Sequence, residues 1–182
     1  LPRFETSTKV CTRTSTIDQS GLAGICGYLQ KMIDKKTFKK SFAAPLEGAG
    51  FVKRGQTWYL EGKDVITAIN LQKSDWSEMY YINVGFWLKS LENAEFFEID
   101  RCHLQYRVER LFPEKNDLII TSCSLEESDQ KMLDALSRFL EDQLIPFLME
   151  CQDEKKLRDL LVLGNLNNGF ISGEARQHLS SL

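Results

Sequence analysis

Apolar and polar residues alternate along two neighbouring stretches of the chain, residues 64–72 and 79–88. Alternation with a period of two is typical of β-strands that bury one face, and aromatic and β-branched residues are frequent in both stretches. Only the short polar segment KSDWSE separates them. We therefore expect an antiparallel hairpin, because parallel strands need a long crossover connection.

Further strands are predicted on both sides of this pair. TWYL at 57–60 is separated from the 64–72 stretch only by the segment EGK, which indicates another hairpin. CHLQYRVERL at 102–111 alternates as well, and DLIITS at 117–122 is a candidate fifth strand.

A helix is predicted before the strands, because Phe38, Phe42 and Leu46 recur every four residues after Asp34. Pro45 lies within this apolar stripe, so we expect it to kink or shorten the helix.

The last third of the chain shows helical spacing again. Leucines three or four residues apart predict a helix over residues 126–151, with Pro146 bending its end. The segment DEKKLRDLLVLG predicts a shorter helix that ends at Gly164, and residues 173–182 predict a last one.

Together these elements predict an α+β fold, in which an antiparallel meander of four to five strands packs against N-terminal and C-terminal helices. Residues 1–16 are rich in Thr and Ser and show no period, and three glycines follow at spacings of three residues. We therefore predict a flexible or loosely attached segment over 1–31 and a single domain over 32–182.

The second face of the predicted sheet is polar without being strongly charged. If the strands pair in chain order, Gly85 leaves a gap in this face where another group could approach. Alternation in the fourth strand places Cys102, Leu104 and Tyr106 on one face and His103, Gln105 and Arg107 on the other. The candidate binding residues are Gln72, Tyr81, Asn83, Trp87, His103, Gln105 and Arg107 on the face, with Lys73 at its rim.

Amides and aromatic rings are suited to a binding groove or a protein interface. Two other interpretations remain: the face is simply solvated, or the C-terminal helices cover it and its polar groups satisfy one another inside the core.

Composition narrows the classes of function. The net charge is −3 and the pI about 5.5, which disfavours non-specific nucleic-acid binding and would favour a basic partner. No apolar run approaches the length of a membrane helix. The five widely spaced cysteines indicate reduced thiols in a cytoplasmic protein rather than a disulfide framework.

Catalytic, cofactor and metal motifs are not predicted. Cys102 and His103 are adjacent, but neighbours on a strand point to opposite faces and cannot form a nucleophile–base pair. Lys53 and Arg54 in GFVKRGQTW could hold a phosphate, although the entry to a hairpin is the simpler interpretation.

Several of these motifs also occur together in a known family. GFVKRGQTWY, VITAINLQKSDW, YYINVGFWL and CHLQYRVERL, in this order, resemble the family of unknown function DUF4304. The resemblance covers residues 32–111 well and the helical tail loosely. It implies a small bacterial cytosolic domain and supplies no activity. It singles out Gly50, Phe51, Trp58, Gln72, Lys73, Ser74, Asn83 and Gly85.

The sequence thus predicts a non-enzymatic binding or protein-interaction module of unknown function, in the narrower form an immunity-type protein. The alternative is a small-molecule-binding protein or an enzyme with an unusual site around Gln72, Asn83, His103 and Arg107. The expected partner is a protein or a small molecule, with no cofactor, nucleic acid or membrane. The oligomeric state is not indicated.

Overall fold

A computed structural model describes residues 33–94 and 96–181 of the chain. The chain divides into two units, residues 1–30 and 31–182, and only the second is described below. The predicted loose segment over residues 1–31 lies outside the described residues, so it stays a prediction.

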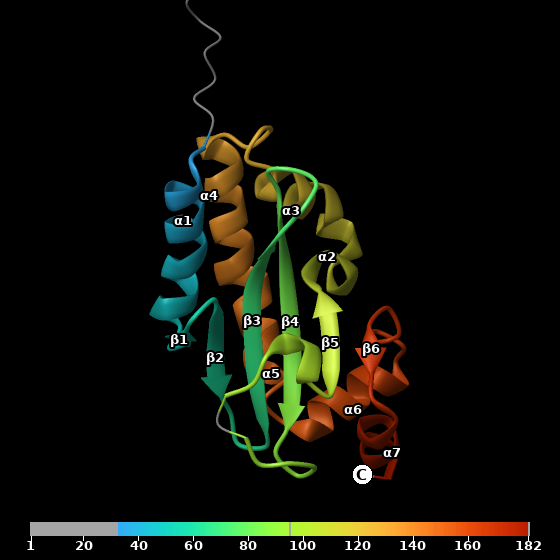
Figure 1. The fold of residues 1–182 in the computed structure, drawn as a ribbon. Helices are drawn as coiled ribbons and strands as arrows, with labels where there is room; N and C mark the ends of the chain where they lie inside the picture. Colours follow the sequence, from blue (N-terminus) through green and yellow to red (C-terminus); the bar gives the residue numbers. More distant parts are fainter. Residues whose placement is uncertain (1–32, 95, 182) are drawn as a thin grey trace, which may run out of the picture. The chain divides into compact units, whose positions relative to one another are not determined.

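Six antiparallel strands form one sheet, in which the order in space follows the order along the chain (Figure 1). This confirms the predicted α+β meander, although the prediction of four to five strands was too low. The strands are β1 (Val52–Arg54), β2 (Thr57–Glu61), β3 (Val65–Lys73), β4 (Tyr80–Leu88), β5 (Leu104–Arg107) and β6 (Phe170–Ile171).

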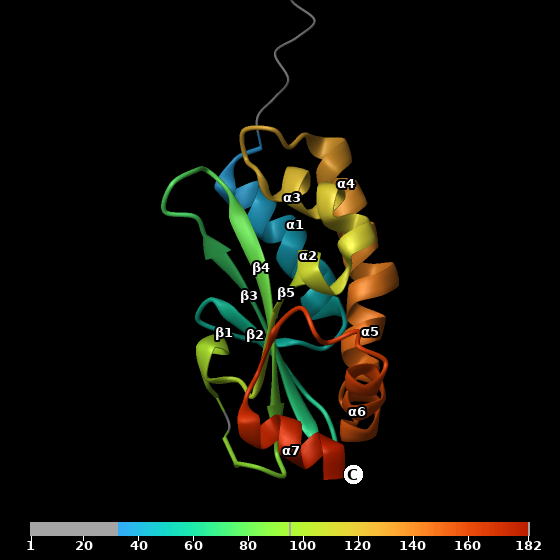
Figure 2. The ribbon, with the colours of Figure 1, turned by 90° about the vertical axis from the view of Figure 1, so that its right-hand side faces the viewer.

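One helix precedes the strands, the others lie between β5 and β6 or follow β6, and the long ones cover one face of the sheet. Figure 2 shows α4 and α5 on one side of the sheet and the connection between β4 and β5 on the other. We call this connection, residues 89–103, the β4–β5 link, and the sheet face on its side the open face. The helices are α1 (Lys35–Gly48), α2 (Val108–Leu111), α3 (Asn116–Cys123), α4 (Gln130–Phe139), α5 (Ile145–Glu150), α6 (Glu154–Val162) and α7 (Gly173–Ser181), with shorter turns η2 (Ile99–Arg101), η3 (Pro113–Lys115) and η4 (Leu140–Leu144).

Helix α1 begins where the sequence predicts it. The Asp34 carboxylate accepts hydrogen bonds from the backbone N–H groups of Lys36 and Thr37, at 2.9 and 3.0 Å, which is typical of a helix N-cap. The helix continues through Pro45 to Gly48. The proline therefore does not end the helix, although it removes one backbone bond, the one to the carbonyl of Ser41.

The long helix predicted over 126–151 is confirmed from Gln130 onward, with one interruption. A π-helical turn, η4, joins α4 to α5 and ends just before Ile145 and Pro146. Pro146 has no N–H for the carbonyl four residues earlier, and its ring crowds that carbonyl. A wider turn at this point lets the helix continue past the proline.

Three strand predictions are confirmed, and two others were wrong in part or in full. Residues 57–60, 64–72 and 79–88 correspond to β2, β3 and β4. The strand predicted over 102–111 is shorter, because α2 begins at Val108. The candidate strand at 117–122 is part of helix α3, since a short apolar run does not distinguish a strand from a buried helix.

The main core lies between the sheet and the helices. Phe38 and Phe42 of α1, Ile82 and Phe86 of β4 and Leu136 of α4 are among its fully or almost fully buried side chains. A smaller apolar cluster lies on the open face under the β4–β5 link and consists of Tyr59, Ile66, Ala68, Trp87, Phe97, Ile99 and Cys102. The link therefore covers one end of the open face and leaves the other end accessible.

No helix within the described part of the chain is long and apolar enough to cross a membrane.

Candidate functional site

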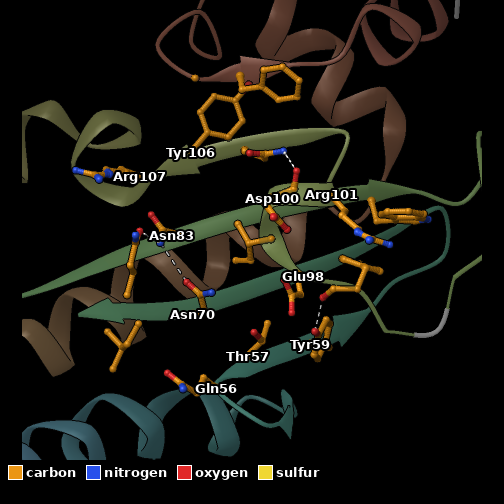
Figure 3. Close-up of a pocket in the computed structure, with 18 of the residues that line it drawn as sticks. Gln56, Thr57, Tyr59, Asn70, Asn83, Glu98, Asp100, Arg101, Tyr106 and Arg107 are labelled. Atoms are coloured by element: carbon orange, nitrogen blue, oxygen red, sulfur yellow. Dashed lines mark hydrogen bonds between the residues drawn. The ribbon is translucent and has the colours of Figure 1, made fainter. Parts of the chain in front are cut away.

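A groove of about 2050 Å³ runs over the open face of the sheet (Figure 3). Side chains from all six strands line it, together with the β4–β5 link, the start of α2 and the turn at residues 167–169. Its floor is the accessible part of the open face, and the link forms one wall. The groove thus occupies the polar face that strand alternation predicts.

The floor contains one continuous row of polar residues across five strands. Strand register pairs each of these residues with the next one on the neighbouring strand. We call this set the polar row; in spatial order it consists of Arg54, Thr57, Asn70, Asn83 and Arg107. A hydroxyl and two amides therefore lie between two arginines, and all five residues line the groove.

The amides of the floor bind one another but keep part of their hydrogen-bonding capacity. Asn83 Nδ2 donates to Asn70 Oδ1 at 3.2 Å and to Gln72 Oε1 at 3.1 Å (Figure 3 shows the first bond). Asn83 Oδ1, Asn70 Nδ2 and Gln72 Nε2 form no hydrogen bond with any residue that the structure describes. One acceptor and two amino groups are thus available to water or a ligand.

Both arginines of the polar row lie over aromatic rings. The guanidinium carbon of Arg54 is 4.8 Å from the ring centre of Phe96, and that of Arg107 is 4.0 Å from the ring centre of Tyr81. Neither arginine forms a salt bridge with another described residue. Stacking restricts the orientation of each guanidinium plane and leaves its N–H edges free to bind an anion.

The β4–β5 link is attached to the sheet by aromatic stacking and backbone hydrogen bonds. The rings of Trp87 and Phe97 stack with centres 4.4 Å apart, and Trp87 Nε1 donates to the carbonyl of Glu92 at 2.7 Å. The Tyr59 hydroxyl donates to the carbonyl of Phe97 at 2.5 Å. These contacts fix the wall of the groove in place.

The gap expected at Gly85 is filled by the protein itself. A Cβ atom added to Gly85 would lie 2.3 Å from Cys102 Sγ, so a side chain here would collide with the β4–β5 link. The glycine is needed for close packing of the link against β4, so another group does approach there as expected, and that group is Cys102 of the protein itself.

The structure brings most of the predicted binding residues to the groove. Gln72, Lys73, Asn83, Trp87, Gln105 and Arg107 line it. Three of these also have structural roles. Lys73 forms a salt bridge with Glu78 at 3.0 Å. Gln105 Nε2 donates to the carbonyls of Asp100 and Cys102, at 2.8 and 3.0 Å. Trp87 holds the link as described above. Tyr81 does not line the groove and instead supports Arg107.

His103 lies apart from the groove and is buried. Its Nδ1 accepts a hydrogen bond from the backbone N–H of Leu88 at 3.0 Å, and its ring centre lies 4.5 Å from that of Trp87. Burial lowers the pKa of this imidazole, against the opposing effect of Glu92 and Glu174. A neutral ring is what the hydrogen bond requires, since Nδ1 accepts.

The predicted alternation in the fourth strand is correct for residues 104–107 and wrong for Cys102. Strand β5 starts at Leu104, after the turn η2 and a bend. Strict alternation does not extend into such a bend. The Cys102 side chain therefore lies on the open face, next to Gly85, and not on the core face.

Several groove residues were not among the predicted set. Arg54 and Thr57 complete the polar row, and the guanidinium of Arg54 stacks on the ring of Phe96. Arg54 is the last residue of β1 and precedes a tight turn at Gly55, where φ is +61°. This confirms the hairpin interpretation of GFVKRGQTW. A three-residue strand has too weak a pattern to assign its faces from sequence.

A serine, a glutamate and a histidine contact one another outside the groove. Ser90 Oγ donates to Glu154 Oε1 at 2.5 Å, and His178 Nε2 lies 3.0 Å from Ser90 Oγ and 2.8 Å from Glu154 Oε2. In a catalytic relay the serine and the acid contact different ring nitrogens. Here both contact Nε2, so the trio connects the β4–β5 link to α6 and α7 instead of activating the serine.

The described cysteines are free, as predicted, and fully buried. Burial raises the pKa of Cys102 and Cys123 well above the ordinary range and that of Cys151 to about 12. Such thiols are poor nucleophiles, because the thiolate is the reactive form. Cys11 and Cys26 lie outside the described residues. Within residues 33–94 and 96–181, no group of His, Cys, Asp or Glu side chains is placed to hold a metal ion.

Comparison with known protein families identifies a matching family model. The family model described as Domain of unknown function (DUF4304) matches residues 42–150. This range starts within α1 and ends with α5, so it extends further into the helical tail than the motifs in the sequence indicate. No curated protein and no solved structure matches the chain. Since the family model covers more than half of its length, the chain belongs to the DUF4304 family.

Proposed function

We propose that this chain is a non-enzymatic binding module whose groove takes a segment of a partner protein. The observation that carries the proposal is the floor of the groove, which is accessible and consists of amide, hydroxyl and arginine side chains with unused donors and acceptors.

The size of the groove favours a polymer over a small metabolite. Pockets for small molecules are usually about 300–1,000 Å³ and enclose most of the ligand. The groove measures about 2050 Å³ and extends across every strand of the sheet. A peptide segment would fill such a volume, whereas a small molecule would contact only part of the floor.

The polar character of the floor supports recognition rather than burial within the domain. The described helices α4, α5 and α6 contribute to the core on the opposite face. Gln72 is exposed, and Asn70 and Asn83 are partly exposed. A binding partner would gain specificity from these amides, because an unsuitable ligand would leave their donors without acceptors.

The narrower form of the proposal is a module that neutralises another protein, as an immunity protein does, in the cytoplasm of a bacterium. The bacterial setting comes from the family resemblance, and the absence of an activated nucleophile among the described residues agrees with a role in binding.

Affinity capture tests the proposal. The tagged full-length chain is expressed in its native cell in three forms: wild type, Gln72→Ala/Asn83→Ala, and Lys131→Ala/Arg138→Ala as a control on exposed positions of α4. We expect the wild type and the control to capture the same protein. The amide double variant should capture about tenfold less, since it loses two hydrogen bonds of about 0.5–1.5 kcal/mol each. Equal capture by all three forms would contradict the proposal.

A further inference from the structure

We infer that the groove takes an acidic, extended peptide segment whose two carboxylates bind Arg54 and Arg107. This inference rests on the proposed function and adds the chemistry and the length of the ligand.

The first argument is the position of the two arginines. They occupy the two ends of the polar row, on β1 and β5, so four inter-strand intervals separate them. At about 4.8 Å per interval, their Cα atoms lie about 19 Å apart. An extended chain rises about 3.3 Å per residue. Two acidic residues about six positions apart in one strand-like segment therefore match this separation.

The second argument is that both guanidinium groups are held in place by stacking but form no salt bridge with a described carboxylate. Each guanidinium is stacked on an aromatic ring, at 4.8 Å for Arg54 and 4.0 Å for Arg107, and neither has an ion-pair partner among the described residues. Lys73, by contrast, is already paired with Glu78. A stacked guanidinium loses little freedom when it binds a carboxylate through two parallel N–H bonds.

The third argument is the separation of charge within the groove. The polar row contains two positive and no negative side chains, and Arg110 of α2 also lines the groove, one helical turn after Arg107. The carboxylates of the groove come from the β4–β5 link and from α2; they are Glu92, Glu98, Asp100 and Glu109.

Figure 3 shows Asp100, which lies on η2, and Glu98, which directly precedes η2, beside the middle of the floor. They disfavour an acidic residue there, although Arg101 of η2 offsets part of their charge. At the end of the row by Arg107, Arg110 offsets Glu109, so the two ends are the better sites for anions. The chain as a whole is acidic, which suggested a basic partner, but the local charge of the polar row is the opposite. The local charge of the polar row determines which ligand charge the groove favours, because screening limits the effect of distant exposed charges to about 10 Å.

Between the arginines, the floor presents groups that suit the backbone of the bound segment. Asn70 Nδ2 can donate to a peptide carbonyl, and Asn83 Oδ1 can accept from a peptide N–H. These contacts require no particular side chain. The middle of the segment is thus recognised by its backbone and the ends by their charge.

The test is a selection of displayed random twelve-residue peptides on the full-length chain. Wild type, Arg54→Gln/Arg107→Gln and the charge-matched control Lys131→Gln/Arg138→Gln are used in parallel. We expect the wild type and the control to enrich peptides with two acidic residues five to seven positions apart. Arg54→Gln and Arg107→Gln, also made singly, should each weaken binding of an enriched peptide about tenfold, and 0.5 M salt should weaken wild-type binding as well.

Three results of the peptide selection would overturn the inference: no enriched peptide, enriched peptides without paired acidic residues, or equal enrichment on the arginine double variant. A single-stranded DNA dodecamer serves as a second probe. Tighter binding of the dodecamer than of the enriched peptides, lost in the arginine double variant, would make the ligand a nucleic acid and also overturn the inference. Capture that depends on Gln72 and Asn83 without selection of acidic peptides would leave the proposed function in place and remove only its acidic ligand.

Discussion

Asn83 on β4 donates its side-chain amide to the Oδ1 of Asn70, its register partner on β3, at 3.2 Å. Both side chains are partly exposed to the groove. The bond orients the two amides but does not seal them from solvent. Water can therefore replace either partner. Loss of this bond should cost as little stability as loss of a surface hydrogen bond.

The first prediction follows from this exposure. We expect Gln72→Ala/Asn83→Ala to lower the free energy of unfolding by less than about 1 kcal/mol, because water replaces the lost partners. In a satisfied buried layer the same change would leave partners without hydrogen bonds, at about 1–3 kcal/mol each. Chemical denaturation measures the difference.

Ile82→Ala is the matched control. Ile82 directly precedes Asn83 on β4, and its side chain is fully buried on the opposite face of the sheet. It should cost about 2–5 kcal/mol through the cavity it leaves. A loss of similar size in the amide double variant would show that the amides are structural.

The open face itself could be predicted from sequence, since strand alternation is strict in β3 and β4. Asn70, Gln72 and Asn83 are placed correctly by their parity alone. The polar row could not be predicted in full. Arg107 was placed on the open face by alternation, but Arg54 and Thr57 were missed, because they depend on the register of β1 and β2, and a shift of one residue would move every side chain to the other face.

The second prediction concerns a buried hydroxyl in the main core. Thr67 is fully buried, and its Oγ1 has no hydrogen-bond partner among the described residues. Thr67→Val replaces the hydroxyl with a methyl group of similar shape and should raise the free energy of unfolding by about 1–2 kcal/mol. Thr67→Ala, which also removes the methyl group, should give no such gain. A destabilised valine variant would show that the hydroxyl is satisfied.

The third prediction is that the free energy of unfolding depends on pH because of His103. Its pKa in the folded protein is lowered from 6.5 by burial, so below about pH 6.5 the unfolded chain binds a proton that the folded protein does not. The contribution of His103 to stability is thus complete above pH 6.5 and is lost as the pH falls towards its folded pKa, by at most about 1.4 kcal/mol per pH unit.

His103→Asn separates this effect from that of the carboxylates. Asparagine can offer its Oδ1 to the N–H of Leu88 in place of Nδ1, but it does not titrate. Denaturation curves from pH 7 to 5 should fall less steeply for the variant than for wild type. Parallel curves would show that His103 is not the group responsible.

The fourth prediction is that Cys102, Cys123 and Cys151 resist alkylation in the folded protein. All three are buried with raised pKa values, so thiolate formation and access of the reagent both require unfolding. Peptide-level mass spectrometry after brief labelling at pH 8 should find them unmodified. After unfolding without reductant, all five cysteines of the chain should react; fewer than five would reveal a disulfide.

The wall of the groove illustrates what local sequence patterns do not show. The β4–β5 link has neither helical nor strand periodicity, yet Phe97 and Cys102 within it bury the end of the open face. Their contacts with Trp87 and Gly85 join residues of different elements. The aromatic pair Phe96–Phe97 was the available signal, because two adjacent phenylalanines in a connection indicate that at least one packs against the domain.

The proposed binding role is tested most directly by photo-crosslinking inside the native cell. A photoreactive amino acid replaces Gln72, which is exposed in the groove, or Lys131, which is exposed on α4 on the other side of the molecule. If the groove takes a partner segment, illumination should join a second protein to position 72 and not to position 131. Crosslinks of equal yield at both positions, or none at position 72, would contradict the assignment of the groove as a binding site.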